Sequence, residues 1–306
     1  MLMYTMTYDI SIGEYKLGML DSVEVHKSVE LLADTAVITL PGAQYNTALE
    51  IEDKLKRGDK VCIKFGYDES GIEEEFSGWL QRISTDGGDI KLHCEDDLFM
   101  FRKEIPNEVM KKVKLDDLLK KVVSGCGLSL SIECTYSWTY DKFVINNATG
   151  YDVLKKVREE CGADIYISDG KLHIHPPGEK MYDERFYDLA LNVEEEELTY
   201  RRAEDKKVKE VEVGSTGGDK IEIKCPTSDD ASMKARGELE VKRRTFDGYE
   251  GSITGWLIPM CRPADSVTLH DKDYPYKDGT YFVTSVTTSF GKDGGKRKIE
   301  LGFRLS

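Results

Sequence analysis

The sequence predicts a mainly β protein with an α+β insertion: two related antiparallel β-barrels and a small α/β domain. Three observations support this fold class. β-branched residues alternate along short segments at both ends of the chain, apolar residues recur at helical spacing only in the middle, and one series of strands and turns occurs twice. The 306 residues are enough for two or three domains of about 100–200 residues each.

Residues 1–98 show the alternation expected of an antiparallel sheet. Alternate residues in Val23–Val25, Thr35–Thr39 and Val61–Phe65 point to one face, and glycines between these runs mark turns. We assign this segment to the first barrel.

Residues 99–180 have the pattern of a small α/β domain. Apolar residues recur at i, i+3, i+4 and i+7 in 114–123, and a second helix is expected from a Thr149 N-cap to Cys161. The dipeptide Asp169-Gly170 predicts a hairpin turn. Short strands are expected at 128–132, 164–167 and 171–175.

Residues 181–306 return to strands and form the second barrel. Strands are expected at 207–213, 220–225, 251–259, 266–270, 280–289 and 296–305. A polar helix at about 228–245 is interpreted as a solvated excursion from the sheet, and the acidic runs Glu73–Glu75 and Glu194–Glu197 as solvated loops.

The repeated series is the most informative feature. Residues 57–94 contain a turn into a strand, a polar loop, an aromatic strand, a glycine turn and a closing strand, and residues 262–303 contain the same parts in the same order. We therefore expect two sheets with equivalent strands in the same order, whereas one continuous sheet would indicate a chance pattern. The residues expected to face inward in both copies are Val61, Ile63, Val267 and Leu269.

Composition excludes several classes of protein. The net charge is −14, which disfavours binding to nucleic acid. No segment reaches the roughly 18 unbroken apolar residues of a membrane helix, so an integral membrane protein is excluded, and the N-terminus lacks the features of a secretory signal. The seven cysteines form no Cys-x-x-Cys pair, which indicates reduced, mostly buried thiols and disfavours a zinc ribbon or a disulfide framework.

Candidate catalytic groups are few. The carboxylates of Glu95, Asp96 and Asp97 could suggest a glycosidase pair, but we interpret them as a solvated strand end. His173 and His175 point to one face of a predicted strand and could hold a metal with a third ligand, but no accompanying motif supplies one, so a half-exposed polar strand face is favoured. Without nucleophile, phosphate-binding or dinucleotide motifs, we expect no enzyme activity, cofactor or metal.

Four strand aromatics allow two interpretations. They can fill the core of their own sheets, which is the default, or form a subunit interface if the barrels assemble side by side. These residues are Trp79, Trp256, Tyr281 and Phe282.

The order of segments resembles a known family. Phe76–Ile83, then Leu92–Phe99, then helix, strand, helix and the Asp169-Gly170 hairpin resemble the late-control-protein D family of contractile-tailed phages. These are baseplate hub proteins of Mu-like phages, similar to the hub half of the valine-glycine repeat proteins of type VI secretion. Gly251–Gly255 followed by Pro263–Val267 resembles the family's glycine-rich strand and turn, with Ala264 in place of the usual glycine.

The resemblance implies a structural role. Family hubs are homotrimers with two tube-like barrels per chain, which adapt a hexameric tail tube to a trimeric spike and form part of the DNA conduit. The implied partners are further copies of the chain, the tail tube protein, the spike or puncturing protein and baseplate wedge proteins, with DNA passing unbound. The implied location is the virion tail baseplate, assembled in the bacterial host cytoplasm without membrane insertion.

Two alternatives stay open. The same fold could serve as the hub of a type VI or extracellular contractile injection system, although the chain carries no spike repeat before Ser306, which favours a phage tail. The second alternative is a tail-associated cell-wall or glycan hydrolase. A glycan turnover assay with substitution of Asp96 would distinguish it from a structural protein.

Overall fold

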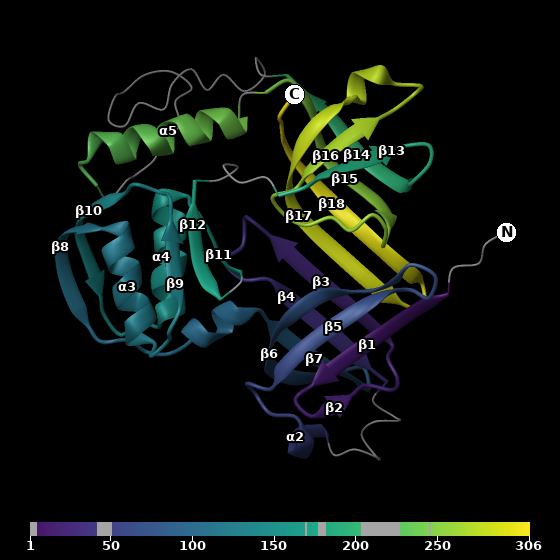
Figure 1. The fold of residues 1–306 in the computed structure, drawn as a ribbon, viewed down its shortest axis with the longest axis horizontal. Coiled ribbons are helices and arrows are strands. Elements are labelled where there is room, and N and C mark those ends of the chain that lie inside the picture. Colours follow the sequence, from purple (N-terminus) through teal and green to yellow (C-terminus); the bar gives the residue numbers. More distant parts are fainter. Residues whose placement is uncertain (1–4, 42–50, 169, 177–181, 203–226, 245) are drawn as a thin grey trace.

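The computed structural model describes residues 5–41, 51–168, 170–176, 182–202, 227–244 and 246–306. Strands dominate both ends of the chain and an α/β unit lies in the middle, which confirms the predicted fold class (Figure 1). No helix in these ranges is both long and apolar enough to span a bilayer.

Seven strands make up the described residues of the N-terminal unit, together with two short helices. They are β1 (Met6–Ile12), β2 (Tyr15–Lys16), β3 (Ser22–Ser28), β4 (Thr35–Leu40), β5 (Lys60–Tyr67), β6 (Gly71–Asp86) and β7 (Asp89–Glu95), with a short helix α2 (Ile51–Lys54) before β5 and a 3-10 helix (Asp97–Phe101) after β7. The acidic run Glu73–Glu75 lies inside β6, so its interpretation as a loop was wrong.

In the part of the chain that the structure describes, the C-terminal unit has six strands. They are β13 (Glu184–Asp188), β14 (Val193–Arg201), β15 (Gly248–Trp256), β16 (Ser266–His270), β17 (Gly279–Gly291) and β18 (Gly294–Arg304), with a 3-10 helix at Pro275–Lys277. The run Glu194–Glu197 lies in β14 and not in a loop, because lysines of β18 balance its charge: Lys296 and Lys298 pair with Glu194 and Glu197. The strands expected at 207–213 and 220–225, and Cys225 with them, lie outside the described residues.

The two units share one sheet, contrary to the expectation of separate sheets. β3 pairs antiparallel with β17, with Ser22–Ser28 opposite Ser285–Gly291. The reason is the length of β17: its first residues pair with β16, and its second half continues past β16 and covers the edge of β3.

The strand order is nevertheless the same in both units. Neighbours follow β1-β5-β6-β7-β4-β3 in the N-terminal unit and β13-β16-β17-β18-β15-β14 in the C-terminal unit. Strands at the same position in the two lists also occur in the same order along the chain. The two units differ in the direction of one pairing: β1 is antiparallel to β5, whereas β13 is parallel to β16. Because a chance likeness would not reproduce five neighbour relations, the repeat stands despite the continuous sheet.

Each unit has its own apolar core. As predicted, Val61 and Ile63 are buried in the N-terminal core, and Val267 and Leu269 are buried in the C-terminal core. No described ladder joins the end strands of either unit, so closure into barrels stays a prediction.

The α/β unit contains both predicted helices and three strands close to those predicted. Its elements are β8 (Glu108–Lys114), α3 (Leu115–Gly125), β9 (Ser131–Cys134), β10 (Thr139–Ile145), α4 (Gly150–Cys161), β11 (Asp164–Ser168) and β12 (Lys171–His175). Thr149 caps α4 in a capping box with Asp152, and Gly162 ends it with a left-handed φ of 70°. The β8–β10 pair was not predicted from the sequence.

The helix α5 (Asp230–Arg244) lies across the α/β unit (Figure 1). The Ser232 hydroxyl accepts a hydrogen bond from the Thr139 backbone N–H at 3.3 Å, and the side chains of Ser232 and Glu240 are buried. The predicted helix is confirmed, but it is not a fully solvated excursion, because these contacts attach it to the α/β unit.

Candidate functional site

A buried ion pair joins the N-terminal and C-terminal units. Glu75 on β6 and Arg297 on β18 have side chains 4% and 3% exposed, and they meet through two hydrogen bonds of 3.0 and 2.9 Å. The Thr288 hydroxyl also donates to Glu75 Oε1 at 2.9 Å. The carboxylate therefore accepts three hydrogen bonds from strands of the other unit.

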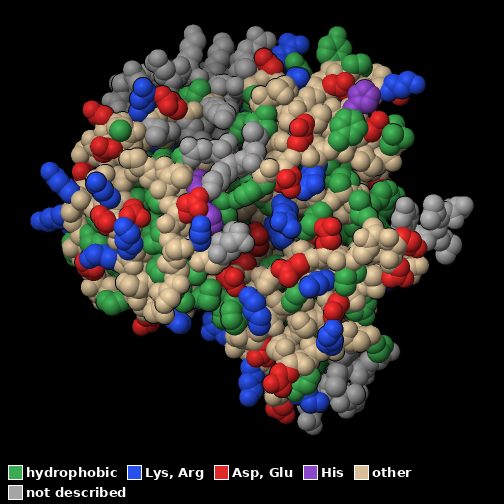
Figure 2. Space-filling view, in the orientation of Figure 1, with side chains coloured by type: hydrophobic (Ala, Val, Ile, Leu, Met, Phe, Trp, Pro, Cys, Tyr) green, Lys and Arg blue, Asp and Glu red, His purple; other side chains and the backbone are tan. Residues whose placement is uncertain are grey.

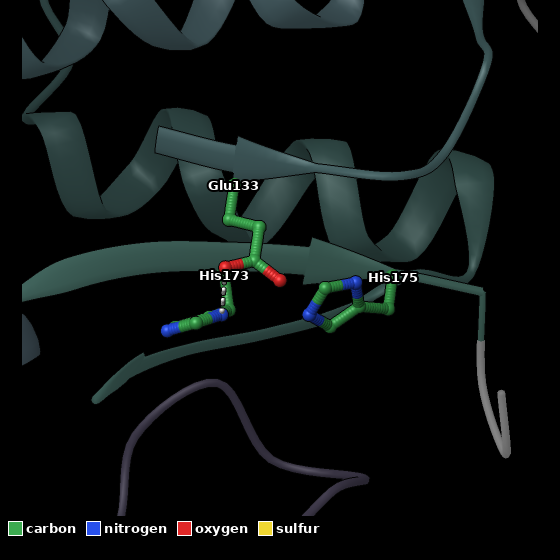
Figure 3. Close-up of side chains that lie close together, drawn as sticks. All are labelled: Glu133, His173 and His175. Atoms are coloured by element: carbon green, nitrogen blue, oxygen red, sulfur yellow. Dashed lines mark ion pairs between the residues drawn. The ribbon is translucent and has the colours of Figure 1, made fainter. Parts of the chain in front are cut away.

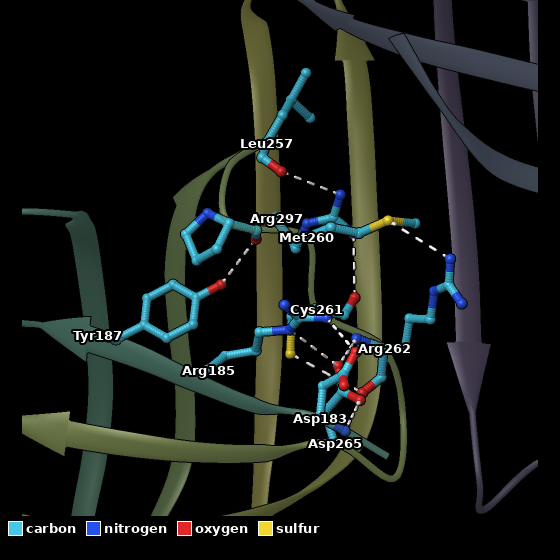
Figure 4. A network of polar contacts seen from close by, with 10 residues as sticks. Asp183, Arg185, Tyr187, Leu257, Met260, Cys261, Arg262, Asp265 and Arg297 are labelled. Carbon is cyan, nitrogen blue, oxygen red and sulfur yellow. Dashed lines mark hydrogen bonds and ion pairs between the residues drawn. The ribbon is translucent and has the colours of Figure 1, made fainter. Parts of the chain in front are cut away.

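Arg297 also fixes the loop that follows β15 (Figure 4). Its guanidinium donates to the carbonyl oxygens of Leu257 and Cys261 at 3.2 and 3.3 Å. Burial lowers the pKa of Arg297, but the adjacent Glu75 carboxylate outweighs this effect and leaves the pKa above its ordinary value. The guanidinium thus stays charged and holds the two units and the loop together.

The turn into β16 is held by a second carboxylate of the same network. Asp265 accepts hydrogen bonds from the backbone N–H groups of Arg262 and Asp183 at 2.8 and 3.2 Å. The preceding residue, Ala264, has a left-handed φ of 69°. This conformation favours glycine, which explains why the resembled family carries glycine at the position of Ala264.

The three adjacent carboxylates at the end of β7 have structural partners. Glu95 is buried and accepts hydrogen bonds from Arg102 at 2.6 and 2.8 Å. Asp96 caps the following 3-10 helix by accepting from the Leu98 N–H at 2.9 Å, and it also accepts from the Asp34 N–H at 3.0 Å. The interpretation as a solvated strand end was therefore wrong for Glu95 and Asp96, because both face polar groups inside the fold.

Asp34 and Asp96 form a half-buried pair of carboxyl groups at the edge of a cavity. Burial, followed by the nearby Asp34 carboxylate, raises the pKa of Asp96 well above its ordinary value. Burial also raises the pKa of Asp34. Each of these shifts favours the protonated form of the carboxyl group relative to an exposed aspartate.

A cavity of about 760 Å³ lies between the α/β unit and the two β units. Figure 2 shows a hollow at the middle of the drawn face with acidic side chains in it. The carboxylates that line the cavity come from all three parts of the chain: Asp34, Glu74, Glu75, Asp96, Asp97, Asp164, Asp183 and Asp265.

The four candidate interface aromatics lie in different surroundings. Tyr281 and Phe282 are buried in the chain's own cores, which corresponds to the default interpretation. Trp79 is half-buried, stacks on Phe99 and donates from Nε1 to Asp97 Oδ1 at 2.8 Å. Trp256 is 46% exposed, so it is the candidate with the most surface available to a neighbouring subunit.

His173 and His175 are buried, not half-exposed. Their side chains lie on the polar face of the three-stranded sheet β11-β12-β9, where the register brings Glu133 opposite His173 (Figure 3). Glu133 was not predicted as a partner of the histidines, because no local sequence pattern indicates the parallel pairing of β9 with β12. This cluster is the one group of described residues that could hold a metal ion.

The described cysteines agree with the predicted free thiols. None of the six forms a disulfide, and four of them are buried. Burial raises the pKa of Cys94, Cys161 and Cys261 to about 12. These thiols are therefore protonated at neutral pH.

Comparison with known proteins gives a clear result for the fold. No protein-family model matches the sequence, and no curated protein matches it. Among solved structures, a tail protein of Neisseria meningitidis MC58 is similar with a TM-score of 0.67 at 13% identity, covering 98% of this chain and 97% of that one. The 43 kDa tail protein of prophage MuSo2 from Shewanella oneidensis has a TM-score of 0.67 at 15% identity, covering 97% of both chains.

A secretion protein is similar too. A component of the Escherichia coli type VI secretion system, which itself resembles phage T4 tail proteins, has a TM-score of 0.64 at 9% identity, covering 97% of this chain and 77% of that one. At these identities the likeness concerns the fold. The chain therefore has the fold of phage tail proteins and of a type VI secretion component, as its resemblance to baseplate hub proteins predicted.

Proposed function

We propose that this chain is a structural baseplate hub protein of a contractile phage or prophage tail, a homotrimer that connects a hexameric tail tube to a trimeric spike. The observation that carries the proposal is the repeat of six strands in one sheet order. Three chains with two similar units each present six similar units, so one end of the ring can match six-fold partners while the whole keeps three-fold symmetry.

The proposed domains are residues 1–98, 99–180 and 181–306. Three apolar cores, each built mainly from one of these segments, support this division, with Leu257 and Phe290 of the last segment packed into the first core. We place the α/β domain and α5 outside the ring, where they leave the conduit open.

The strand pairing that joins the N-terminal and C-terminal units, here called the junction, suggests how two chains pair in the trimer. β17 of the C-terminal unit pairs with β3 of the N-terminal unit. In the repeat, β6 is the equivalent of β17 and β14 the equivalent of β3. Among described residues, β14 pairs only with β15, and the last five residues of β6 pair only with β7. Repeating the junction therefore pairs β6 of one copy with β14 of the next.

The matching ladders also give the register of this contact. Arg82 in β6 corresponds to Thr287 in β17, because each lies opposite the residue four positions after the start of the next strand, His93 or Lys298. The ladders extend this correspondence to the strands at the other end of each path, from β7 through β4 to β3 and from β18 through β15 to β14. Residue by residue along these ladders, Glu197 in β14 corresponds to His26 in β3.

The contact inside the chain then predicts a contact between copies. His26 lies opposite Thr287, and their side chains are hydrogen-bonded at 2.9 Å. The equivalent pair between copies is Glu197 and Arg82, which carry opposite charges and are both exposed within one chain. Opposite charges directly across a ladder stabilise the pairing, whereas like charges oppose it.

Light scattering of the purified full chain tests the proposal. We expect three times 34.7 kDa, about 104 kDa. Arg82→Glu and Glu197→Arg should each weaken the trimer, and the two together should restore it, whereas Lys142→Glu, at an exposed position of β10, should have no effect. A hexamer would contradict the repeat argument, and a protein that stays monomeric at high concentration would contradict self-assembly.

The proposed conduit carries DNA without binding it. A chain with a net charge of −14 repels phosphate groups, so DNA should not adhere to the ring. The proposed partners are the tail tube, spike and wedge proteins, and the proposed location is the virion baseplate after assembly in the host cytoplasm. We expect no retention of DNA by the protein at physiological salt.

The alternative machine is a type VI or extracellular contractile injection system, which the similarity to a type VI component favours. Neighbouring genes for a tape-measure protein and wedge proteins would indicate a phage tail. We propose no enzymatic activity, because Asp96 of the candidate carboxylates is occupied by two backbone N–H groups. Glycan turnover that Asp96→Asn abolishes would support the hydrolase instead.

A further inference from the structure

Glu133, His173 and His175 place three metal-ligand groups on one face of a small sheet. The two histidines are alternate residues of β12, so their imidazoles share a face, and Glu133 is the direct partner of His173 in β9. One oxygen or nitrogen atom from each lies within 4.8 Å of the others. In Figure 3 the carboxylate is above the His173 ring, and the His175 ring is beside both.

A small divalent ion would draw the three ligand atoms together, by up to about 1.4 Å for a pair at the 4.8 Å limit. A tetrahedral zinc ion with bonds of about 2.0–2.1 Å separates its ligand atoms by about 3.4 Å. The Glu133 Oε2 to His173 Nδ1 distance is 3.8 Å, so these two atoms need to move by only about half an ångström relative to each other.

The surroundings orient the imidazoles. His175 Nδ1 is hydrogen-bonded to the Thr135 hydroxyl at 2.8 Å, so Nε2 is the nitrogen that can bind an ion. The Tyr166 ring stacks on His173 with centroids 4.9 Å apart and planes inclined by 6°, which restrains rotation of the imidazole. His173 and His175 are 8% and 2% exposed, so an ion here would be largely screened from water.

The donors select the chemical class of the ion. Two imidazoles and one carboxylate suit borderline transition ions such as Zn²⁺, whereas Mg²⁺ and Ca²⁺ prefer oxygen ligands alone. We propose that Glu133, His173 and His175 bind one Zn²⁺-like ion per chain, with Thr135 as a positioning residue. The ion links β9, which follows α3, to β12, which follows α4, and thereby stabilises the α/β unit. The Lys171 ammonium, 3.8 Å from Glu133 Oε2, competes for the carboxylate and must give way.

Metal analysis of the full chain, without an affinity tag, tests the site. After dialysis against a chelator and then against Zn²⁺, we expect about one equivalent of zinc per chain, a higher thermal midpoint, and with Co²⁺ the visible absorption of a tetrahedral site. Glu133→Gln should lower zinc affinity at least tenfold. This variant is the least disruptive because the Glu133 side chain is 36% exposed. Thr135→Val should weaken binding about 10- to 100-fold while the stoichiometry stays at one.

His93→Gln is the matched control. His93 is also a strand histidine with a hydroxyl partner, Ser84 at 2.8 Å, but it lies in β7 of the N-terminal unit. Zinc binding and the thermal shift should be unchanged in this variant. Less than a tenth of an equivalent of zinc in the wild type, or equal loss in His93→Gln and Glu133→Gln, would overturn the proposal. In that case the three residues form a polar cluster without an ion.

Discussion

Replacing Glu75 by glutamine should destabilise the association of the N-terminal and C-terminal units. The two NH₂ groups of the Arg297 guanidinium point their four N–H bonds at five acceptors, of which two are the carboxylate oxygens of Glu75. In Glu75→Gln the shape is kept but the negative charge is lost, and the new amide N–H₂ group turns a donor toward the guanidinium. The other three acceptors are uncharged, so Arg297 becomes a buried charge without a counter-ion.

The size of the effect follows from this burial. Removing one partner of a buried ion pair costs about 3–5 kcal/mol. At about 1.4 kcal/mol for each factor of ten, this corresponds to roughly a hundred- to several-thousand-fold change in the folding equilibrium. Replacing both partners, as in Glu75→Leu with Arg297→Met, should cost far less, because well-packed apolar residues avoid the desolvation of two charges.

Urea unfolding followed by tryptophan fluorescence measures these differences, since Trp79 and Trp256 lie in the N-terminal and C-terminal units. Asp86→Asn is the matched control, because Asp86 lies on the same strand as Glu75 but its ion pair with Lys91 is exposed. The urea midpoint of this variant should equal that of the wild type. The reasoning is refuted if Glu75→Gln unfolds at the same urea concentration as the control. It is also refuted if the apolar double variant is as unstable as the single one.

Three further predictions concern other parts of the chain. Because burial raises the pKa values of Asp34 and Asp96, the folded state binds protons that the unfolded state releases, so stability should fall as pH rises from about 4 toward neutrality. Asp34→Asn should flatten this decline in the thermal midpoint, and an unchanged slope would contradict it. Thr149→Ala should cost about 0.5–2 kcal/mol of unfolding free energy through loss of the capping box, and an unchanged value would show that the cap is not needed. Alkylation of the native protein should modify half-buried Cys62 before buried Cys161. After unfolding without a reductant, all seven thiols should react, and fewer than seven modified thiols would indicate a disulfide.

Local signals predicted the elements that local chemistry determines. The α4 helix begins at its Thr149 cap and ends at Gly162, and β11 and β12 pair antiparallel as a hairpin requires, although Asp169 of the expected turn lies outside the described residues. The strand β16 has the predicted bounds, since a polar turn precedes it and its apolar residues alternate. In each case the residues that specify the structure are adjacent in the sequence.

The misses at Glu75, in β14 and at Glu133 share a physical cause, which is pairing between distant segments. A glutamate such as Glu75 can be solvated in a loop or paired with a cation inside a sheet. Its partner Arg297 is more than 200 residues away in the sequence, so nothing near Glu75 distinguishes the two cases. The acidic strand β14 is stabilised in the same way by lysines of β18. Glu133 joins the histidines of β12 only through a parallel ladder. No window of sequence contains both partners of these contacts.

The differences between the two units support a role in a ring. In the proposed trimer, the path from one junction to the next runs through β3-β4-β7-β6 and then β14-β15-β18-β17, so eight strands from each of three chains give a closed path of 24 strands. All ladders on this path have the same antiparallel sense in both units. The one pairing that differs in sense, β1–β5 against β13–β16, lies off the path. Six equivalent junctions require the same pairing direction only in the strands that connect one junction to the next. The pairings β1–β5 and β13–β16 lie outside these strands, so they can differ in direction without affecting the ring.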